Sequence, residues 1–247
     1  MNSTLDIFLW LIFPYICLTI FVLGHVGRYR YDKFGWTSRS SQMYEDRILR
    51  WANPMFHFGI LAVFLGHVMG LGIPKAWTDA VGISEGMYHF MAISVGAVAG
   101  VFTIVGFVGL IYRRRFTKSV LGATTKMDKL MYLMLALVIL TGLINTGSGV
   151  VGQYDYREGV SIWFRSIFYF NPQPELMVGA PLSFQLHGLL AISLFAVWPF
   201  TRLVHAFTAP ISYFFRPYVL YRSRDDHEGS RSRRRGWDKV DTIPRRR

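Results

Sequence analysis

Five long apolar stretches constrain this chain more than any other feature of its sequence. They cover roughly residues 6–27, 54–73, 88–112, 130–151 and 183–207. The hydrocarbon core of a bilayer is about 30 Å thick, so a spanning helix needs about 20 apolar residues at a rise of about 1.5 Å each. Hydrocarbon also offers no partner to unpaired backbone groups, which favours helices. We therefore predict an all-α membrane protein with five transmembrane helices.

The composition supports this prediction and argues against a soluble domain. Hydrophobic residues make up 52% of the chain and the mean hydropathy is +0.29, and these residues form blocks instead of amphipathic stripes. The first stretch follows MNSTLDIF, which has no basic residue, and no small-residue cleavage site comes after it. We expect this stretch to remain as a membrane anchor and not to be removed as a signal peptide.

The basic residues alternate between the segments that connect the apolar stretches. Residues 28–50, 113–129 and 202–247 hold 24 of the 27 Lys and Arg, whereas residues 74–87 and 152–182 hold the other three. Basic residues gather on the cytoplasmic side of membrane proteins. We therefore place the N-terminus outside and the C-terminus in the cytoplasm. The same pattern accounts for the net charge of +12, so we expect contact with membrane lipid and no nucleic-acid partner.

Two segments outside the spans carry further predictions. The end of the chain is basic and polar, so we divide it into a transmembrane domain, residues 1–207, and a basic cytoplasmic tail, residues 208–247. The sequence VSIWFRSIFYF, residues 160–170, is too short and too aromatic for a span. We expect it to form a helix on the outer membrane surface, with Trp163 and Phe168 among the aromatic side chains in the headgroup zone.

Four of the seven histidines lie within two of the apolar stretches. His57 and His67 are ten positions apart in the second stretch, and His187 and His205 are eighteen apart in the fifth. On straight α-helices these spacings correspond to about 15 Å and about 27 Å. Eighteen residues are five whole turns, so His187 and His205 are expected on one side of a helix that Pro199 kinks. Because the two spans are antiparallel, His57 shares the inner half of the membrane with His205, and His67 the outer half with His187.

Each of these pairs has the two nitrogens that a haem iron needs as axial ligands. Bis-histidine ligation leaves no open position on the iron, which suits electron transfer. The single cysteine, Cys17, excludes a covalent Cys-x-x-Cys-His attachment and an iron–sulfur cluster held by this chain alone. We therefore predict two non-covalent haem b groups, one near each membrane face, bound by His57/His205 and His67/His187.

A different interpretation treats the four histidines as packing residues or as a proton relay. An ionisable residue within a membrane usually has a function, but binding a haem is only one of several such functions. The remaining histidines are His25 near the inner end of the first span, His89 at the outer start of the third, and His227 in the tail. We assign none of them a haem, and we take His89 as a candidate for contact with a proton-donating substrate.

Several further motifs accompany the histidines: RYRYD (28–32) with SSQM (40–43), FHFGILAVFLGH (56–67), RRRF (113–116) with ATT (123–125), FQLHGLL (184–190) and PFTRLVHAFTAPISYFFRPYVLYRSR (199–224). With these motifs the sequence resembles, over about residues 7–224, the gamma subunit, which is the cytochrome b subunit, of membrane-bound respiratory nitrate reductases. The resemblance implies five spans in the plasma (inner) membrane and the same two histidine pairs on two haems b. It also implies quinol oxidation near the outer face and electron transfer to an iron–sulfur subunit and a molybdenum catalytic subunit. Nitrate chemistry is not expected on this chain itself.

A quinol site beside the outer histidine pair follows from this resemblance. We expect Gly66, His67, His187 and His89 to line it. The family pattern has a lysine near the start of the third span, whereas GMYHFMA at this place has none and presents Tyr88 and His89 instead. The quinol site of this chain therefore departs from the family pattern.

Two other functions are compatible with the sequence. One is a cytochrome b anchor of another quinone-linked oxidoreductase, such as a hydrogenase, a formate dehydrogenase or a sulfur-cycle reductase, which co-purified subunits and their metals would distinguish. The other is a haem-free membrane transporter or assembly protein. Transporters often show inverted repeats and interrupted spans, and neither feature is visible in this sequence.

Overall fold

The computed structural model of the chain describes residues 3–32, 35, 40–150, 154–208 and 215. These residues form helices and no strand, and five of the helices are long and apolar enough to cross a membrane. The spans are Thr4–Tyr31, Leu49–Gly72, Glu85–Phe116, Lys126–Ser148 and Leu182–Phe200. The prediction of an all-α protein with five transmembrane helices is confirmed, and the orientation of the termini stays a prediction.

The chain divides into two compact units, Met1–Ala209 and Pro210–Arg247. Nearly all of the second unit, and with it nearly all of the predicted basic tail, lies outside the described residues. The elements of the first unit are α1 (Thr4–Ile7), η1 (Phe8–Ile12), α2 (Phe13–Tyr31), η3 (Gln42–Tyr44), α3 (Leu49–His67), η4 (Val68–Gly72), α4 (Lys75–Ala80), α5 (Glu85–Phe116), α6 (Lys118–Gly122), α7 (Lys126–Val150), α8 (Val160–Phe168), α9 (Pro174–Val178), α10 (Leu182–Val197), η5 (Trp198–Phe200) and η6 (Arg202–Phe207). Of these, η1 and η4 are π-helical turns, and η3, η5 and η6 are 3₁₀-helices.

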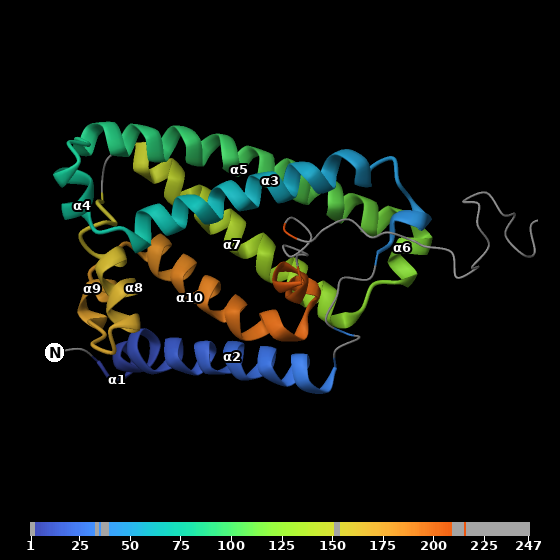
Figure 1. Cartoon of the computed structure of the whole chain (residues 1–247), viewed down its shortest axis with the longest axis horizontal. Helices are drawn as coiled ribbons and strands as arrows, with labels where there is room; N and C mark the ends of the chain where they lie inside the picture. The colour runs from blue at the N-terminus through green and yellow to red at the C-terminus, as the bar shows by residue number, and fades with distance from the viewer. Residues whose placement is uncertain (1–2, 33–34, 36–39, 151–153, 209–214, 216–247) are drawn as a thin grey trace, which may run out of the picture. The chain divides into compact units, whose positions relative to one another are not determined.

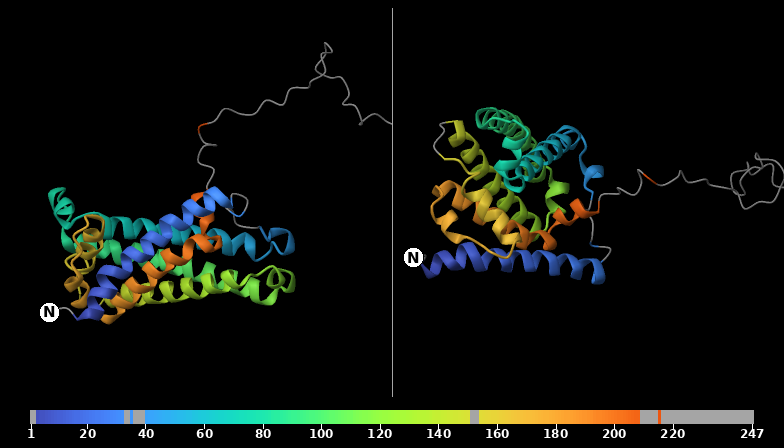
Figure 2. Two further views of the ribbon diagram at one scale, coloured as in Figure 1. Left: turned by 90° about the horizontal axis from the view of Figure 1, so that it is seen from below. Right: turned by 60° about the vertical axis from the view of Figure 1, so that its left-hand side comes forward.

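The five long helices pack in an order that differs from their order along the chain. Helix α10 packs against both α2 and α7, α7 packs against α5, and α5 packs against α3 (Figure 1). The short helices α8 and α9 lie together at one end, where α8 contacts η4 and α9 contacts α1 (Figures 1 and 2). The two histidine-bearing spans, α3 and the one that begins with α10, are therefore brought into one bundle although more than 100 residues separate them.

Small residues allow α3 and α5 to approach closely. A Cβ atom added to Gly59 of α3 would lie 2.6 Å from the backbone nitrogen and the Oγ1 atom of Thr103 on α5. Real Cβ atoms do not come that close to backbone atoms, so only glycine fits at this crossing. Small residues at helix crossings of this kind are typical of membrane proteins, where packing contacts drive helix association.

The second span begins earlier than the sequence predicted. We expected it to start at Asn53-Pro54, whereas α3 begins at Leu49 and contains Pro54 in its interior. Proline removes one backbone hydrogen bond of a helix. Pro54 stands only five residues after the first residue of α3, where the loss of one bond close to the helix end is tolerated.

The fifth span is not the continuous helix that the sequence predicted. Helix α10 ends at Val197, the 3₁₀-helix η5 contains Pro199, and Thr201 is extended with φ −116° and ψ 178°. His205 lies on the separate 3₁₀-helix η6. The expectation that His187 and His205 lie on one side of a single helix kinked at Pro199 was therefore wrong, because the helix breaks between them.

The helix predicted for residues 160–170 is present, and its location on the membrane surface stays a prediction; the expected exposure of Trp163 was wrong. Helix α8 covers Val160–Phe168. Trp163 is buried, donates from Nε1 to the Trp10 carbonyl over 2.9 Å, and packs edge-on against the Trp10 ring. Phe168, in contrast, is exposed. Helix α8 therefore packs against the first span through Trp163. The N–H group of a buried indole needs a hydrogen-bond partner, and the Trp10 carbonyl provides it.

Candidate functional site

The four histidines of the two apolar stretches meet as two pairs in the structure. The ring centres of His57 on α3 and His205 on η6 are 5.9 Å apart, with an interplanar angle of 65°. The ring centres of His67 at the end of α3 and His187 on α10 are 6.0 Å apart, with an angle of 29°. The pair of His67 and His187 therefore joins the second span to the fifth, and the pair of His57 and His205 joins the second span to η6, at a different level of α3.

The Nδ1 atoms of three of these histidines face backbone carbonyl oxygens of their own helices. His57 Nδ1 lies 2.8 Å from the Asn53 carbonyl, His67 Nδ1 lies 2.8 Å from the Val63 carbonyl, and His205 Nδ1 lies 2.5 Å from the Arg202 carbonyl. A carbonyl oxygen only accepts hydrogen bonds, so these Nδ1 atoms carry the proton. The Nε2 atoms of these rings are then left with a lone pair, which is the form that binds a metal.

The fourth histidine, His187, uses a hydroxyl group on a neighbouring helix. Its Nδ1 lies 3.0 Å from Oγ1 of Thr141 on α7. That hydroxyl also lies 2.8 Å from the Leu137 carbonyl and 3.1 Å from the Val138 carbonyl. Because it donates its only hydrogen to a carbonyl, its oxygen accepts from the Nδ1–H group of His187. All four histidines consequently have the same tautomer.

The spacing within each pair fits one metal ion between two rings. Two imidazoles on opposite sides of a metal, with metal–nitrogen bonds of about 2 Å, have ring centres about 6 Å apart. Both observed separations are close to this value. No group of three or more His, Cys, Asp or Glu side chains that could hold a metal is found among the described residues. Two protein ligands at each place suit a haem, whose macrocycle itself supplies the other four.

The surroundings of His67 are open on one side. Gly66 and His67 are both exposed, and a Cβ atom added to Gly66 would meet nothing within 4 Å. The π-helical turn η4 follows His67 directly, and such turns occur frequently at functional sites. His89 is exposed on α5, four residues after its start. That His89 lies beside Gly66 in one quinol site stays a prediction.

A polar cluster that the sequence did not reveal closes the same end of the bundle. The guanidinium carbon of Arg157 lies 3.8 Å from the centre of the Tyr88 ring, and Arg157 donates to Thr78 Oγ1 over 2.8 Å. The hydroxyl groups of Tyr88 and Tyr156 are 3.4 Å apart. Tyr156 also covers Gly70, where an added Cβ would meet its hydroxyl at 2.8 Å. The residues YDYR that supply this cluster lie far from Tyr88 in sequence, so only the fold brings them together.

Ion pairs stabilise this end of the protein. Lys75 Nζ lies 2.9 Å from Glu158, 3.0 Å from Glu85 and 3.8 Å from Asp155. Hydrogen bonds to Glu158 and Glu85 raise the pKa of Lys75 above its ordinary value, whereas burial raises the pKa of Asp155. Lys75 therefore stays charged and connects α4 with the start of α5 and with the segment before α8.

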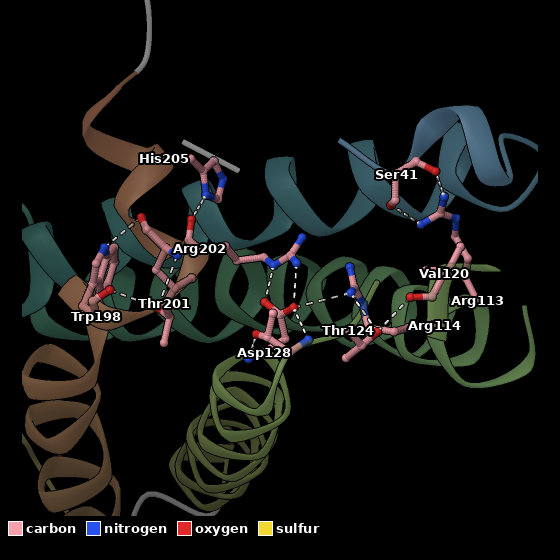
Figure 3. Close-up of polar contacts among 12 residues, drawn as sticks. Ser41, Arg113, Arg114, Val120, Thr124, Asp128, Trp198, Thr201, Arg202 and His205 are labelled. Carbon is pink, nitrogen blue, oxygen red and sulfur yellow. Dashed lines mark hydrogen bonds and ion pairs between the residues drawn. The ribbon is translucent and has the colours of Figure 1, made fainter. Parts of the chain in front are cut away.

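The opposite end carries a second group of buried charges, shown in Figure 3. Arg113, whose side chain is 2% exposed, donates to Glu45 and to both the hydroxyl and the carbonyl of Ser41. Asp128, at the start of α7, pairs with Arg202 and lies 3.7 Å from Arg114. Asp128 lies just before the fourth apolar stretch of the sequence, residues 130–151. Its pairing with Arg202, three residues before His205, depends on the tertiary structure.

The fold and these contacts define a multi-pass helical membrane protein with two opposed histidine pairs. The chain belongs to the nitrate reductase gamma subunit family, whose model matches residues 6–224. The resemblance seen in the sequence is thereby confirmed.

Curated relatives show the same family. The chain is 45% identical to the nitrate reductase gamma chain of Bacillus subtilis over 217 residues, which cover 87% of this chain and 97% of the relative. It is 36% identical to the respiratory nitrate reductase 2 gamma chain of Escherichia coli over 231 residues, covering 91% and 100%. It is also 57% identical to the nitrate reductase-like protein NarX of Mycobacterium tuberculosis over 231 residues, 92% of this chain. The chain spans only 35% of the length of that relative.

Proposed function

We propose that this chain is a di-haem b membrane subunit of a respiratory nitrate reductase in the plasma membrane. It oxidises quinol near the outer face and passes the electrons to an iron–sulfur subunit and a molybdenum catalytic subunit on the cytoplasmic side. The observation that carries this proposal is the two opposed histidine pairs, with ring centres 5.9 and 6.0 Å apart. Family membership supports the partner assignment, because the relatives in Bacillus subtilis and Escherichia coli are gamma chains of nitrate reductases.

The roles of the four histidines follow from their tautomer. His57 and His205 would hold one haem b through Nε2, and His67 and His187 would hold the other. A haem with two histidine ligands supplies one-electron transfer without an open site for oxygen. The hydrogen bonds at Nδ1 fix the ring orientation and increase the basicity of each ligand. Two such centres at different levels of α3 give electrons a route from one end of the bundle towards the other.

The quinol is expected to bind beside the outer pair. His67 is exposed, and the neighbouring Gly66 leaves open space where any side chain would project. A flat quinol ring needs close approach to the outer haem, which a glycine allows. His67, His187 and His89 are the further residues that we propose at this site, with His89 accepting a proton from the quinol. Proton release outside and electron transfer inward would make turnover electrogenic.

An optical redox titration of membranes that contain the chain, with a haem-to-protein ratio, tests this function. Two b haems for each chain, both reduced by added quinol, are expected. The metals of co-purified subunits then distinguish a nitrate reductase, which brings molybdenum and iron–sulfur clusters, from another quinone-linked complex. Absence of haem from a folded protein would refute the proposal. The histidines would then be packing residues or members of a proton relay.

A further inference from the structure

The segment that carries His205 is not held by a regular α-helix. His205 lies on the six-residue 3₁₀-helix η6, which follows the break at Thr201. Helices of this type have poorer hydrogen-bond geometry than α-helices and are used in short pieces. The orientation of the His205 ring must therefore depend on contacts between this segment and the rest of the protein.

Contacts within the segment fix its local shape. Trp198 Nε1 donates to the Leu203 carbonyl over 2.8 Å, and Thr201 Oγ1 donates to the Trp198 carbonyl over 2.9 Å. Arg28 on α2 donates to the Pro199 carbonyl over 3.2 Å. These bonds close the turn and hold its beginning. None of them involves Arg202, whose carbonyl accepts the hydrogen bond from the His205 ring.

The contact between Arg202 and Asp128 does reach that residue, as Figure 3 shows. Arg202 Nε donates to Asp128 Oδ1 over 2.7 Å, and a terminal nitrogen donates to Oδ2 over 2.8 Å. The Arg202 backbone carbonyl in turn accepts the hydrogen bond from His205 Nδ1. Asp128 is itself held, because its side chain is 5% exposed and the Thr125 backbone N–H donates to Oδ2 over 3.0 Å.

We propose that Asp128 is a positioning residue for the inner haem: through its two bonds to Arg202 it holds the carbonyl that orients His205. We call this pair the Asp128–Arg202 clamp. The inference rests on the proposed function, since it gives His205 the role of an axial ligand. Paired bonds between a carboxylate and an arginine fix direction as well as distance. Partners of a ligating histidine tune the affinity and potential of the metal in the same way.

The clamp is tested by substitutions of Asp128 in the full chain within its membrane complex. Asp128→Asn breaks the charge pair, and Asp128→Glu keeps the charge but displaces the carboxylate by one methylene. Glu45→Gln is the matched control, because it leaves Arg113 buried without its carboxylate at the same end of the bundle and has no bond to η6. The measurements are the haem-to-protein ratio, the midpoint potential of each haem and the unfolding temperature. The signal that disappears in His205→Ala identifies the inner haem.

We expect Asp128→Asn to lose the inner haem, or to raise its midpoint potential, while the outer haem keeps its wild-type potential. Asp128→Glu should shift the inner potential in the same direction but less, and Glu45→Gln should lower the unfolding temperature without moving either potential. If Asp128→Asn does not fold, Asp128→Glu decides. Wild-type potentials for both haems in the folded Asp128 variants would overturn the inference, and so would equal shifts in Glu45→Gln. A wild-type protein without haem would instead overturn the proposed function.

Discussion

Thr141 Oγ1 accepts a hydrogen bond from His187 Nδ1 over 3.0 Å and thereby links α7, a helix without any histidine, to the pair of His67 and His187. The other three paired histidines use carbonyl groups of their own helices. Of the four paired histidines, His187 is therefore the one whose Nδ1 contacts a side chain of another span.

Replacing Thr141 by valine should affect one haem only. Valine has the same shape but cannot accept a hydrogen bond, so the His187 N–H group loses the Thr141 hydroxyl as a partner, at a cost of about 0.5–1.5 kcal/mol. The imidazole becomes a weaker ligand to the iron. The midpoint potential of the outer haem should therefore rise, while that of the inner haem stays unchanged. A redox titration measures both values. Thr146→Val is the control, because Thr146 lies on the same helix and bonds only to the Gly142 carbonyl among the contacts described for it. Equal effects of the two variants would contradict the role of Thr141.

Removing single histidines should separate the two haems. His67→Ala should lower the haem content from two to one for each chain and stop quinol oxidation, because the outer haem loses a ligand. His57→Ala should remove the other haem and block transfer to the partner subunits, while quinol still reduces the outer haem. Pyridine haemochrome assays and quinol-reduction spectra measure these effects. Retention of both haems in either variant would show that the pairs are assigned wrongly.

A methyl group at Gly66 should obstruct the quinol and leave the protein intact. Because an added Cβ meets no atom within 4 Å, Gly66→Ala should stabilise the helix by about 0.5–1 kcal/mol. The KM for quinol should nevertheless rise several-fold, with both haems retained. Gly27→Ala on α2 is the control, since an added Cβ there also meets nothing within 4 Å. Unchanged quinol kinetics in Gly66→Ala would exclude this surface as the binding site.

The pair between Glu45 and Arg113 should make stability depend on pH. Burial raises the pKa of Glu45, but hydrogen bonds from the Ile48 backbone and from Arg113 outweigh this and hold it below its ordinary value of 4.5. A carboxyl with a lowered pKa in the folded state stabilises the protein above its ordinary pKa, and this contribution is lost as the pH falls through the folded value.

Thermal unfolding in detergent measures this effect. Glu45→Gln should lower the unfolding temperature most at neutral pH, and the difference from the wild type should shrink below about pH 4.5. Asp32→Asn is a suitable comparison, because Asp32 pairs with Arg28 at an exposed position and such pairs contribute only about 0–1 kcal/mol. A constant difference between wild type and Glu45→Gln at all pH values would contradict the assignment.

The sequence by itself determined the class of this protein. Apolar stretches long enough to span a bilayer leave helices as the only structure that satisfies the backbone in hydrocarbon, and the fold agrees. The spacing of His57, His67, His187 and His205, together with antiparallel spans, was also enough to match the histidines by depth, because depth follows directly from position along a spanning helix.

Tertiary structure decided how those histidines are held. The break after α10 places His205 on η6, and no local pattern predicts it, because a proline inside a helix can either kink the helix or end it. The contacts of Thr141 with His187 and of Asp128 with Arg202 join residues that are 46 and 74 positions apart. Periodicity and composition describe single segments, whereas a hydrogen bond between two helices depends on how the helices pack. The ligand candidates were therefore visible in the sequence, and the groups that orient them were decided by the fold.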